Sequence, residues 1–148
     1  SSENIYLWAN LGVLPFWFML ILIPNSRFTQ IFVNSIIAPL ILCTAYVYII
    51  YQSFLLDEPI LDFFLLYVSL DNLYTVFATE SFLLIFWLHF LSLNLFLGSW
   101  VSRDSVKYNI SRGLIFVPLI LIYFTGPIGL VLYWLIRTFY SKKLGFHD

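Results

Sequence analysis

Long apolar runs alternate with short polar segments along the whole chain. Four of these runs reach the length of about 20 residues that a helix needs to cross a bilayer. They lie at about residues 4–23, 31–54, 81–101 and 113–137. The pattern therefore predicts an all-α integral membrane protein with four transmembrane helices. We expect a single transmembrane domain, because no repeat, low-complexity tract or linker divides residues 1–148.

The segment between the second and third runs has a different pattern. About residues 59–79 are rich in leucine and aromatic residues, but acidic side chains lie within and on both sides of this segment. Charges at this density disfavour a fifth helix across the hydrocarbon. We predict an interfacial or re-entrant amphipathic helix with its aromatic face toward the bilayer. The acidic residues are Asp57, Glu58, Asp62, Asp71 and Glu80.

Composition excludes a soluble domain. Hydrophobic residues make up 61% of the chain and charged residues 10%, whereas soluble domains have about 25% charged residues. The net charge of −1 argues against a nucleic-acid partner, so the expected partner is the lipid bilayer. Cys43 is the single cysteine, which excludes an internal disulfide and a cysteine metal site. The first residues lead directly into an apolar run, without the pattern of a signal or transit peptide.

Basic residues give conflicting information about orientation in the membrane. Lysine and arginine are retained on the cytoplasmic or stromal side, so they mark the loops of that side. With four spans, the first and third loops lie on one side and both termini on the other. The loops hold four basic residues and the C-terminal tail holds three, which favours the loops as the positive side. They are Arg27, Arg103, Lys107 and Arg112 in the loops, and Arg137, Lys142 and Lys143 in the tail.

Polar residues interrupt the third apolar run, where a lipid-facing helix carries only hydrocarbon. The run contains His89, Ser92, Asn94 and Ser99. An ionisable side chain at membrane depth costs several kcal/mol, so it marks a candidate functional site. At about 100° per residue, His89, Ser92 and Ser99 form one stripe, and Asn94 lies about 140° around the helix from His89. A site that includes both His89 and Asn94 must therefore wrap around this helix, unless the helix is distorted.

Three roles are open for His89. It can hydrogen-bond a neighbouring helix, act as a general acid or base, or serve as the axial ligand of a pigment or haem metal. Bis-histidine haem ligation within the membrane is excluded, because the other histidine is His147 in the tail. No metal cage of several protein ligands is expected. The chain also lacks the usual hydrolase, zinc-protease and nucleotide-binding motifs.

The last apolar run contains a break, where Pro127 follows Gly126 and precedes Gly129. Proline kinks a helix, and small residues allow two helices to approach closely. The break therefore serves helix packing, or it shapes a pocket for a long ligand.

Four short blocks occur once each along the chain, in an order and spacing typical of one family. They are Leu14-Pro15-Phe16-Trp17 with Pro24-Asn25; Ala45-Tyr46-Val47-Tyr48; Phe77-Ala78-Thr79-Glu80 leading to Trp87-Leu88-His89; and Gly126-Pro127-Ile128-Gly129. Over about residues 9–137 the chain resembles the small plastid and bacterial membrane proteins of the abscisic-acid-deficient, neoxanthin-synthesis type. The third run resembles that family's motif at Trp87, His89, Leu91, Leu95, Phe96, Gly98 and Trp100. One position departs from the motif, because Asn94 stands where the family usually has aspartate.

The resemblance implies a protein that acts on xanthophylls in a plastid membrane, either thylakoid or envelope. The implied reaction is an isomerisation of the violaxanthin-to-neoxanthin type, which needs an acid and a base and no redox cofactor. The resemblance suggests His89 as the acid–base residue, with Asn94 orienting a hydroxyl or epoxide of the substrate. Around a bound carotenoid or chlorophyll we expect Trp87, Ser92, Trp100 and Pro127.

The amide of Asn94 favours a second interpretation. An amide fills nearly the same volume as a carboxylate and still hydrogen-bonds, but it does not exchange a proton near neutral pH. On this interpretation the chain is a non-catalytic, pigment-contacting accessory subunit of a larger photosynthetic membrane complex, with His89 as a chlorophyll ligand. The sequence leaves open whether the chain is an enzyme.

Overall fold

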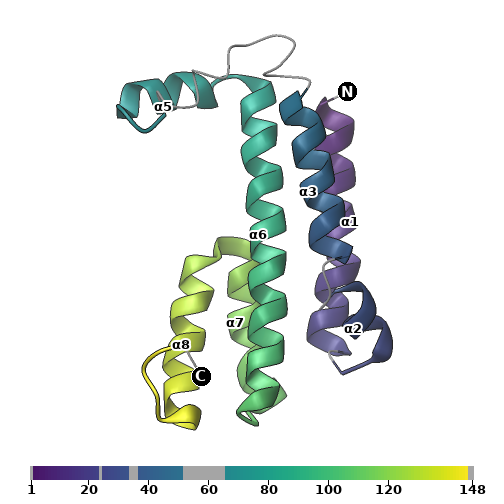
Figure 1. Cartoon of the computed structure of the whole chain (residues 1–148), viewed down its shortest axis with the longest axis vertical. Helices are drawn as coiled ribbons and strands as arrows, with labels where there is room; N and C mark the ends of the chain where they lie inside the picture. The colour runs from purple at the N-terminus through teal and green to yellow at the C-terminus, as the bar shows by residue number, and fades with distance from the viewer. Residues whose placement is uncertain (1, 24, 34–36, 52–65, 147–148) are drawn as a thin grey trace.

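One long helix, α6 (Glu80–Lys107), runs the length of the molecule and the other helices gather around it (Figure 1). The computed structural model describes residues 2–23, 25–33, 37–51 and 66–146. Within these residues there are seven helices and no strand, which confirms the all-α prediction. Helix α6 continues beyond the end predicted at residue 101, because its polar last turns still suit a helix. Glu80 in its first turn and Lys107 in its last match the helix dipole.

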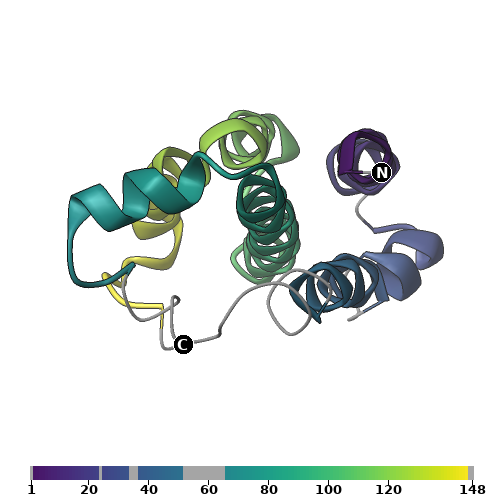
Figure 2. The ribbon, with the colours of Figure 1, turned by 90° about the horizontal axis from the view of Figure 1, so that it is seen from above.

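Helices α1 (Ser2–Leu22) and α3 (Ile37–Ile50) both pack against α6. Figure 2 shows them together on one side of α6, with the C-terminal helices on the other. The buried core between these helices is mainly apolar, and Gly98 of α6 allows the Trp17 ring of α1 to approach closely. A Cβ at Gly98 would lie 2.5 Å from that ring.

The second apolar run is not one helix from its predicted start. Helix α2 (Arg27–Phe32) ends within it, and α3 follows as a separate helix. The Ser26 hydroxyl caps α2 by accepting from the amide of Phe28 at 3.1 Å, and the buried Thr29 hydroxyl donates to Ile23 O at 2.6 Å. Residues 34–36 and 52–54 of the predicted span lie outside the described part of the chain.

The acidic segment contains a short amphipathic helix, α5 (Leu70–Phe77), which lies across the end of α6 (Figure 1). The Ser69 hydroxyl caps this helix by accepting from the amide of Asn72 at 3.1 Å. A short helix at this place agrees with the prediction, and its position at a membrane interface stays a prediction. Residues 59–65 of the predicted segment lie outside the described residues.

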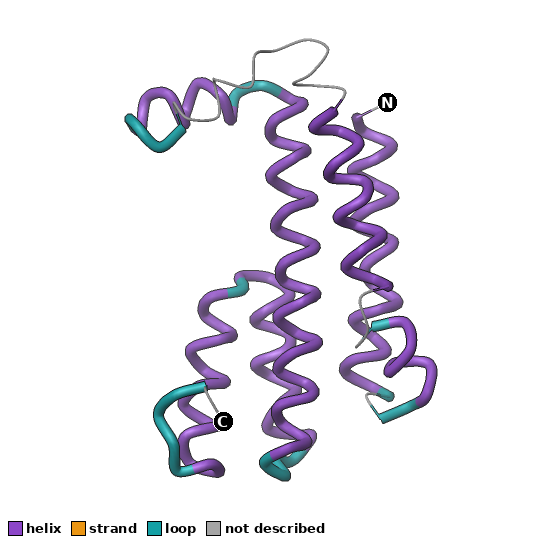
Figure 3. Tube along the Cα trace, viewed as in Figure 1, coloured by secondary structure: helices purple, strands orange, loops and turns teal. Residues whose placement is uncertain are grey.

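The fourth apolar run folds into a hairpin, so the prediction of one helix over residues 113–137 is wrong. Helix α7 (Arg112–Thr125) and helix α8 (Pro127–Ser141) run antiparallel along one half of α6 (Figures 1 and 3). Gly126 between them has φ +69°, which a residue with a side chain rarely adopts. Pro127 has no amide hydrogen to continue α7, but suits the first turn of α8.

Two of the described helices, α1 and α6, are long and apolar enough to cross a membrane. At about 1.5 Å per residue, α6 is about 42 Å long, whereas α7 and α8 are each about 22 Å long. A bilayer core is about 30 Å thick, so neither arm of the hairpin crosses it upright. The described helices therefore support two of the four predicted spans by length and composition.

The hairpin also changes the predicted placement of the chain ends. Because α8 returns along α7, its C-terminal end lies beside that of α6, at the opposite end of the molecule from the start of α1 (Figure 1). The prediction placed both termini on the same side of the membrane, whereas these two helix ends lie at opposite ends of the molecule (Figure 1); the side of the membrane that each end occupies stays a prediction. The basis of the predicted arrangement, a fourth helix that crosses from one side to the other, is absent from the described structure.

Close contact between the two arms of the hairpin depends on Gly129. A Cβ at Gly129 would lie 2.5 Å from the backbone nitrogen of Ile122 and 2.7 Å from Pro118 O. We expect Gly129→Ala to push α8 away from α7 and to lower the free energy of unfolding by about 1–3 kcal/mol. Thermal unfolding in mild detergent measures this effect. The matched control is Gly12→Ala in α1, where nothing lies within 4 Å; an equal loss in both variants would contradict the prediction.

Candidate functional site

Helix α6 is regular, so Asn94 lies on another face from His89, as the sequence predicts. Ser92 and Asn94 are buried, whereas the side chain of His89 is exposed. The Ser92 hydroxyl donates to the backbone carbonyl of His89 at 3.2 Å, and the buried Ser99 hydroxyl donates to Val33 O at 3.4 Å. Both serines are thus satisfied by backbone carbonyls, and neither approaches the imidazole of His89 in these contacts. The structure therefore does not assemble the whole stripe into one site.

His89 lies on the outside of the helix bundle among aromatic rings. Its ring centre is 6.1 Å from that of Tyr46 on α3 and 6.2 Å from that of Phe86, one turn earlier on α6. No group of three metal-ligating side chains occurs within the described residues. An exposed imidazole in this setting is open to a ligand that approaches α6 from outside the bundle.

Asn94 lies at the tip of the hairpin, halfway along α6. Its side chain packs against Gly126 so closely that a Cβ there would lie 2.6 Å from Asn94 Oδ1. The residue is 8% exposed, and its Nδ2 has no hydrogen-bond partner within the described structure. The N-terminus of α8, which starts at Pro127, carries the positive end of a helix dipole. The spare amide donor and this dipole both favour an acceptor oxygen at the tip.

The two tryptophans from the predicted site lie apart. Trp87 is half-buried near the start of α6, where its Nε1 donates to Asn10 Oδ1 of α1 at 2.9 Å. Trp100 packs near the other end, with its ring centre 5.9 Å from that of Tyr133 and 4.9 Å from that of Phe146. The structure thus brings Asn94 to the hairpin tip with Pro127, but it does not bring all six predicted residues around one cavity.

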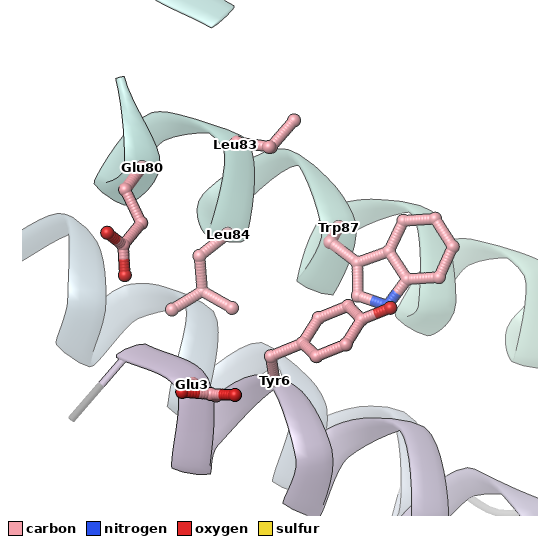
Figure 4. A pocket seen from close by; sticks show the side chains of 6 residues that line it. All are labelled: Glu3, Tyr6, Glu80, Leu83, Leu84 and Trp87. Carbon is pink, nitrogen blue, oxygen red and sulfur yellow. The ribbon is translucent and has the colours of Figure 1, made fainter. Parts of the chain in front are cut away.

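A pocket of about 430 Å³ opens between the N-terminal ends of α1 and α6. Figure 4 shows the carboxylates of Glu3 and Glu80 at one end, and the rings of Tyr6 and Trp87 side by side at the other. Trp87 is the one predicted site residue in its wall. The pocket combines apolar walls with two groups that accept hydrogen bonds. Its full lining is Glu3, Tyr6, Glu80, Leu83, Leu84 and Trp87.

An extensive polar cluster joins α6 and α8, and the sequence did not reveal it. Arg137 of α8 is 1% exposed, and its Nε donates to Asp104 Oδ2 of α6 at 2.5 Å. The Tyr133 hydroxyl donates to the same oxygen, and Arg137 Nη1 donates to Gly145 O at 2.9 Å. The guanidinium also lies 4.6 Å from the ring centre of Tyr108. The available signal was the spacing of Tyr133 and Arg137, four residues apart on one face of an apolar helix.

The fold and these sites define a small all-helical protein built on one long helix with a half-length helical hairpin. The chain belongs to the ABA4-like family, because the family model described as ABA DEFICIENT 4-like matches residues 4–133. This confirms the resemblance seen in the sequence. The chain is similar to Protein ABA DEFICIENT 4, chloroplastic, of Arabidopsis thaliana, with 25% identity over 125 residues and 79% of the chain covered.

The chain spans 57% of the length of that relative. No solved structure matches it.

The buried ion pair gives a prediction for stability. Arg137→Met leaves the Asp104 carboxylate buried without its cation, and we expect a loss of about 3–5 kcal/mol in the free energy of unfolding. The double variant Asp104→Leu/Arg137→Met should recover most of this loss, because it removes both charges. Denaturant unfolding in detergent micelles measures the difference. The control is Arg103→Met, an exposed cation next to Asp104; a loss as large as that of Arg137→Met would refute the argument.

Proposed function

We propose that the chain is a plastid membrane protein that binds an epoxy-xanthophyll and isomerises it in a reaction of the violaxanthin-to-neoxanthin type. The observation that carries this proposal is the family match over residues 4–133. The similarity to a chloroplastic protein supports the plastid location. The two long apolar helices support insertion in a membrane. On this proposal α1 and α6 cross the bilayer, and the α7–α8 hairpin enters and leaves it on one side.

In the proposed reaction, His89 carries out both proton transfers that the isomerisation requires. His89, as imidazolium, donates a proton to the epoxide oxygen, and the carbon–oxygen bond breaks. The neutral imidazole then removes a proton from the ring-adjacent carbon of the polyene, which leaves an allene and restores the imidazolium. Atoms and protons balance over this cycle, and no redox cofactor takes part. The exposure of His89 among aromatic rings supports access by an apolar polyene.

Binding is assigned to two further places. The spare Nδ2 donor of Asn94 is suited to hold a hydroxyl or epoxide oxygen at the hairpin tip. The pocket between α1 and α6 has apolar walls for a carotenoid ring, and Glu3 and Glu80 can accept hydrogen bonds from a ring hydroxyl. Because His89 lies on another face of α6 from Asn94, the proposal gives proton transfer to His89 and ligand positioning to Asn94.

We expect His89→Ala to reduce formation of allenic carotenoid by about a hundredfold or more, because the imidazole carries both proton transfers of the proposed cycle. The assay supplies violaxanthin to the full chain in reconstituted membranes and separates the products by chromatography. Leu93→Ala is the matched control, since Leu93 is exposed one turn further along α6 and carries no titratable group. Unchanged product from the His89 variant would remove the catalytic role.

Two observations favour a second function, that of a pigment-contacting accessory subunit of a photosynthetic membrane complex. The exposed His89 side chain is available to a chlorophyll of a neighbouring subunit, and Asn94 has no carboxylate for proton transfer. Mild-detergent purification separates the two functions: a large chlorophyll-rich particle supports the accessory role, and a small particle with an epoxy or allenic xanthophyll supports the isomerase. Gain of isomerase activity in Asn94→Asp, with none in the parent chain, would mark a degenerate enzyme.

Membrane placement has its own test. In a Cys43→Ser background, single cysteines at Ser111 and Lys143 should react with a membrane-impermeant maleimide from the same side, because the hairpin returns to its starting side. A cysteine at Ala78, near the other end of α6, should react from the opposite side. The Cys43→Ser chain, which has no cysteine and should not react, is the control. Labelling of positions 111 and 143 from opposite sides would show that the fourth run crosses the membrane after all.

A further inference from the structure

Every basic residue of the chain lies toward one end of the molecule (Figure 1), because the hairpin brings those of α8 and the following segment to the others. The chain has seven lysine and arginine residues in total. They lie at the start of α2, at the C-terminal end of α6, at the start of α7, and at or just after the end of α8, all at the lower end in Figure 1. The sequence analysis placed these residues on both sides of the membrane, because it predicted a fourth transmembrane helix. They are Arg27, Arg103, Lys107, Arg112, Arg137, Lys142 and Lys143.

Exposed acidic side chains are absent from this end in the part of the chain that the structure describes. Asp104 is the acidic residue located there, and its carboxylate is 9% exposed and bound by Arg137 and Tyr133. The exposed acids Glu3 and Glu80 lie at the other end of the molecule, as does Asp71 on α5. Positive and negative charges therefore lie at opposite ends of the long axis. No exposed carboxylate of the described residues offsets the positive end.

The cations of this end remain at the surface. Arg27, Arg103 and Lys142 are exposed. Arg112 is half-buried where its Nη2 donates to Asn25 Oδ1 at 3.3 Å. Burial lowers the pKa of the Arg112 guanidinium from its ordinary value, but a guanidinium stays charged at neutral pH. Each of these groups can therefore attract an anion from outside the bundle.

Exposed aromatic rings lie among the basic residues. Phe28 and Phe32 of α2 stack with ring centres 6.5 Å apart, and both are exposed. Phe139 and Tyr140 are exposed near the end of α8. Basic and aromatic side chains in one zone are typical of the level of lipid headgroups, where rings lie at the boundary of hydrocarbon and water. The basic residues come from the ends of several helices, so they form a broad surface that can face a membrane leaflet.

We propose that this basic end binds the anionic headgroups of one membrane leaflet. This interaction surface comprises the exposed basic residues of α2, α6 and the segment after α8, with the aromatic rings beside them. It rests on the membrane placement made under the proposed function. Each lysine or arginine near an anionic leaflet adds attraction that falls with salt. The α7–α8 hairpin is essential to this surface, because it brings the C-terminal basic residues to the others.

The test uses the full chain reconstituted in vesicles of equal parts phosphatidylcholine and phosphatidylglycerol. After extraction in mild detergent, the lipids that remain bound are identified by mass spectrometry. We expect phosphatidylglycerol to be retained several-fold over phosphatidylcholine, and the ratio to fall as salt is raised. In the triple variant Arg27→Gln/Arg103→Gln/Lys142→Gln the ratio should approach one. Equal retention of both lipids by the parent chain, or undiminished preference in the triple variant, overturns the proposal.

A charge-conserving variant, Arg27→Lys/Arg103→Lys/Lys142→Arg, separates loss of charge from loss of structure. It should keep the preference for phosphatidylglycerol, and loss of the preference here would contradict an electrostatic contact. Flotation with vesicles of phosphatidylcholine alone tests membrane insertion independently of headgroup charge. A chain that inserts in these neutral vesicles but shows no preference for phosphatidylglycerol refutes the basic surface and leaves the membrane placement intact.

Discussion

The reversal of the chain at Gly126 and Pro127 is the constraint on which the rest of the structure depends. Gly126 takes a backbone conformation that side chains rarely tolerate, and Pro127 has no amide hydrogen to continue α7. The amide of Gly126 still donates to Ile122 O at 2.9 Å, so the turn satisfies this buried group. Because the chain turns here, α8 returns along α7, and residues 128–146 lie beside the C-terminal half of α6 (Figure 1).

The Asp104–Arg137 ion pair fixes this return. Removing two charges from water is costly, and the attraction between them offsets the cost only where the geometry is good and further hydrogen bonds are made. Arg137 meets this condition, since its donors reach both Asp104 oxygens, the Tyr108 hydroxyl and Gly145 O. The bond to Gly145 also folds the segment after α8 back onto the bundle. One ion pair therefore holds the far end of the hairpin and the following chain together.

The sequence predicts the strongest local signals and misses those that depend on distant contacts. The long apolar runs of α1 and α6 define helices, and because α6 is regular, the angle between His89 and Asn94 follows directly from 100° per residue. Proline alone did not locate the reversal. Pro15 lies inside α1 and Pro118 inside α7, without ending either helix. What distinguishes Pro127 is the preceding glycine with positive φ.

The periodicity of the sequence does not predict which residues from separate segments come into contact. Asp104 and Arg137 each look like ordinary charges near the end of an apolar run, and only the antiparallel return of α8 brings them together. The same holds for Asn94, whose neighbour Gly126 is 32 positions later in the chain. Conversely, Trp87 and Trp100 belong to one motif but lie at opposite ends of α6, because 13 residues of helix separate them by about 20 Å. The linear motif therefore identifies the family, but it does not show which residues lie together in space.

The position of Asn94 defines what the hairpin tip can recognise. A buried amide nitrogen without an acceptor is costly, so a protein that keeps one has a use for the donor or a water to satisfy it. The N-terminus of α8 adds positive potential at the same place. Both features favour an uncharged or partially negative oxygen over a cation, and an apolar molecule with a terminal hydroxyl or epoxide satisfies them. An aspartate here would instead face the same dipole as an anion, which stabilises its charged form and weakens it as an acid. In the proposed function, asparagine therefore suits this tip to ligand binding, and proton transfer is left to the exposed imidazole of His89.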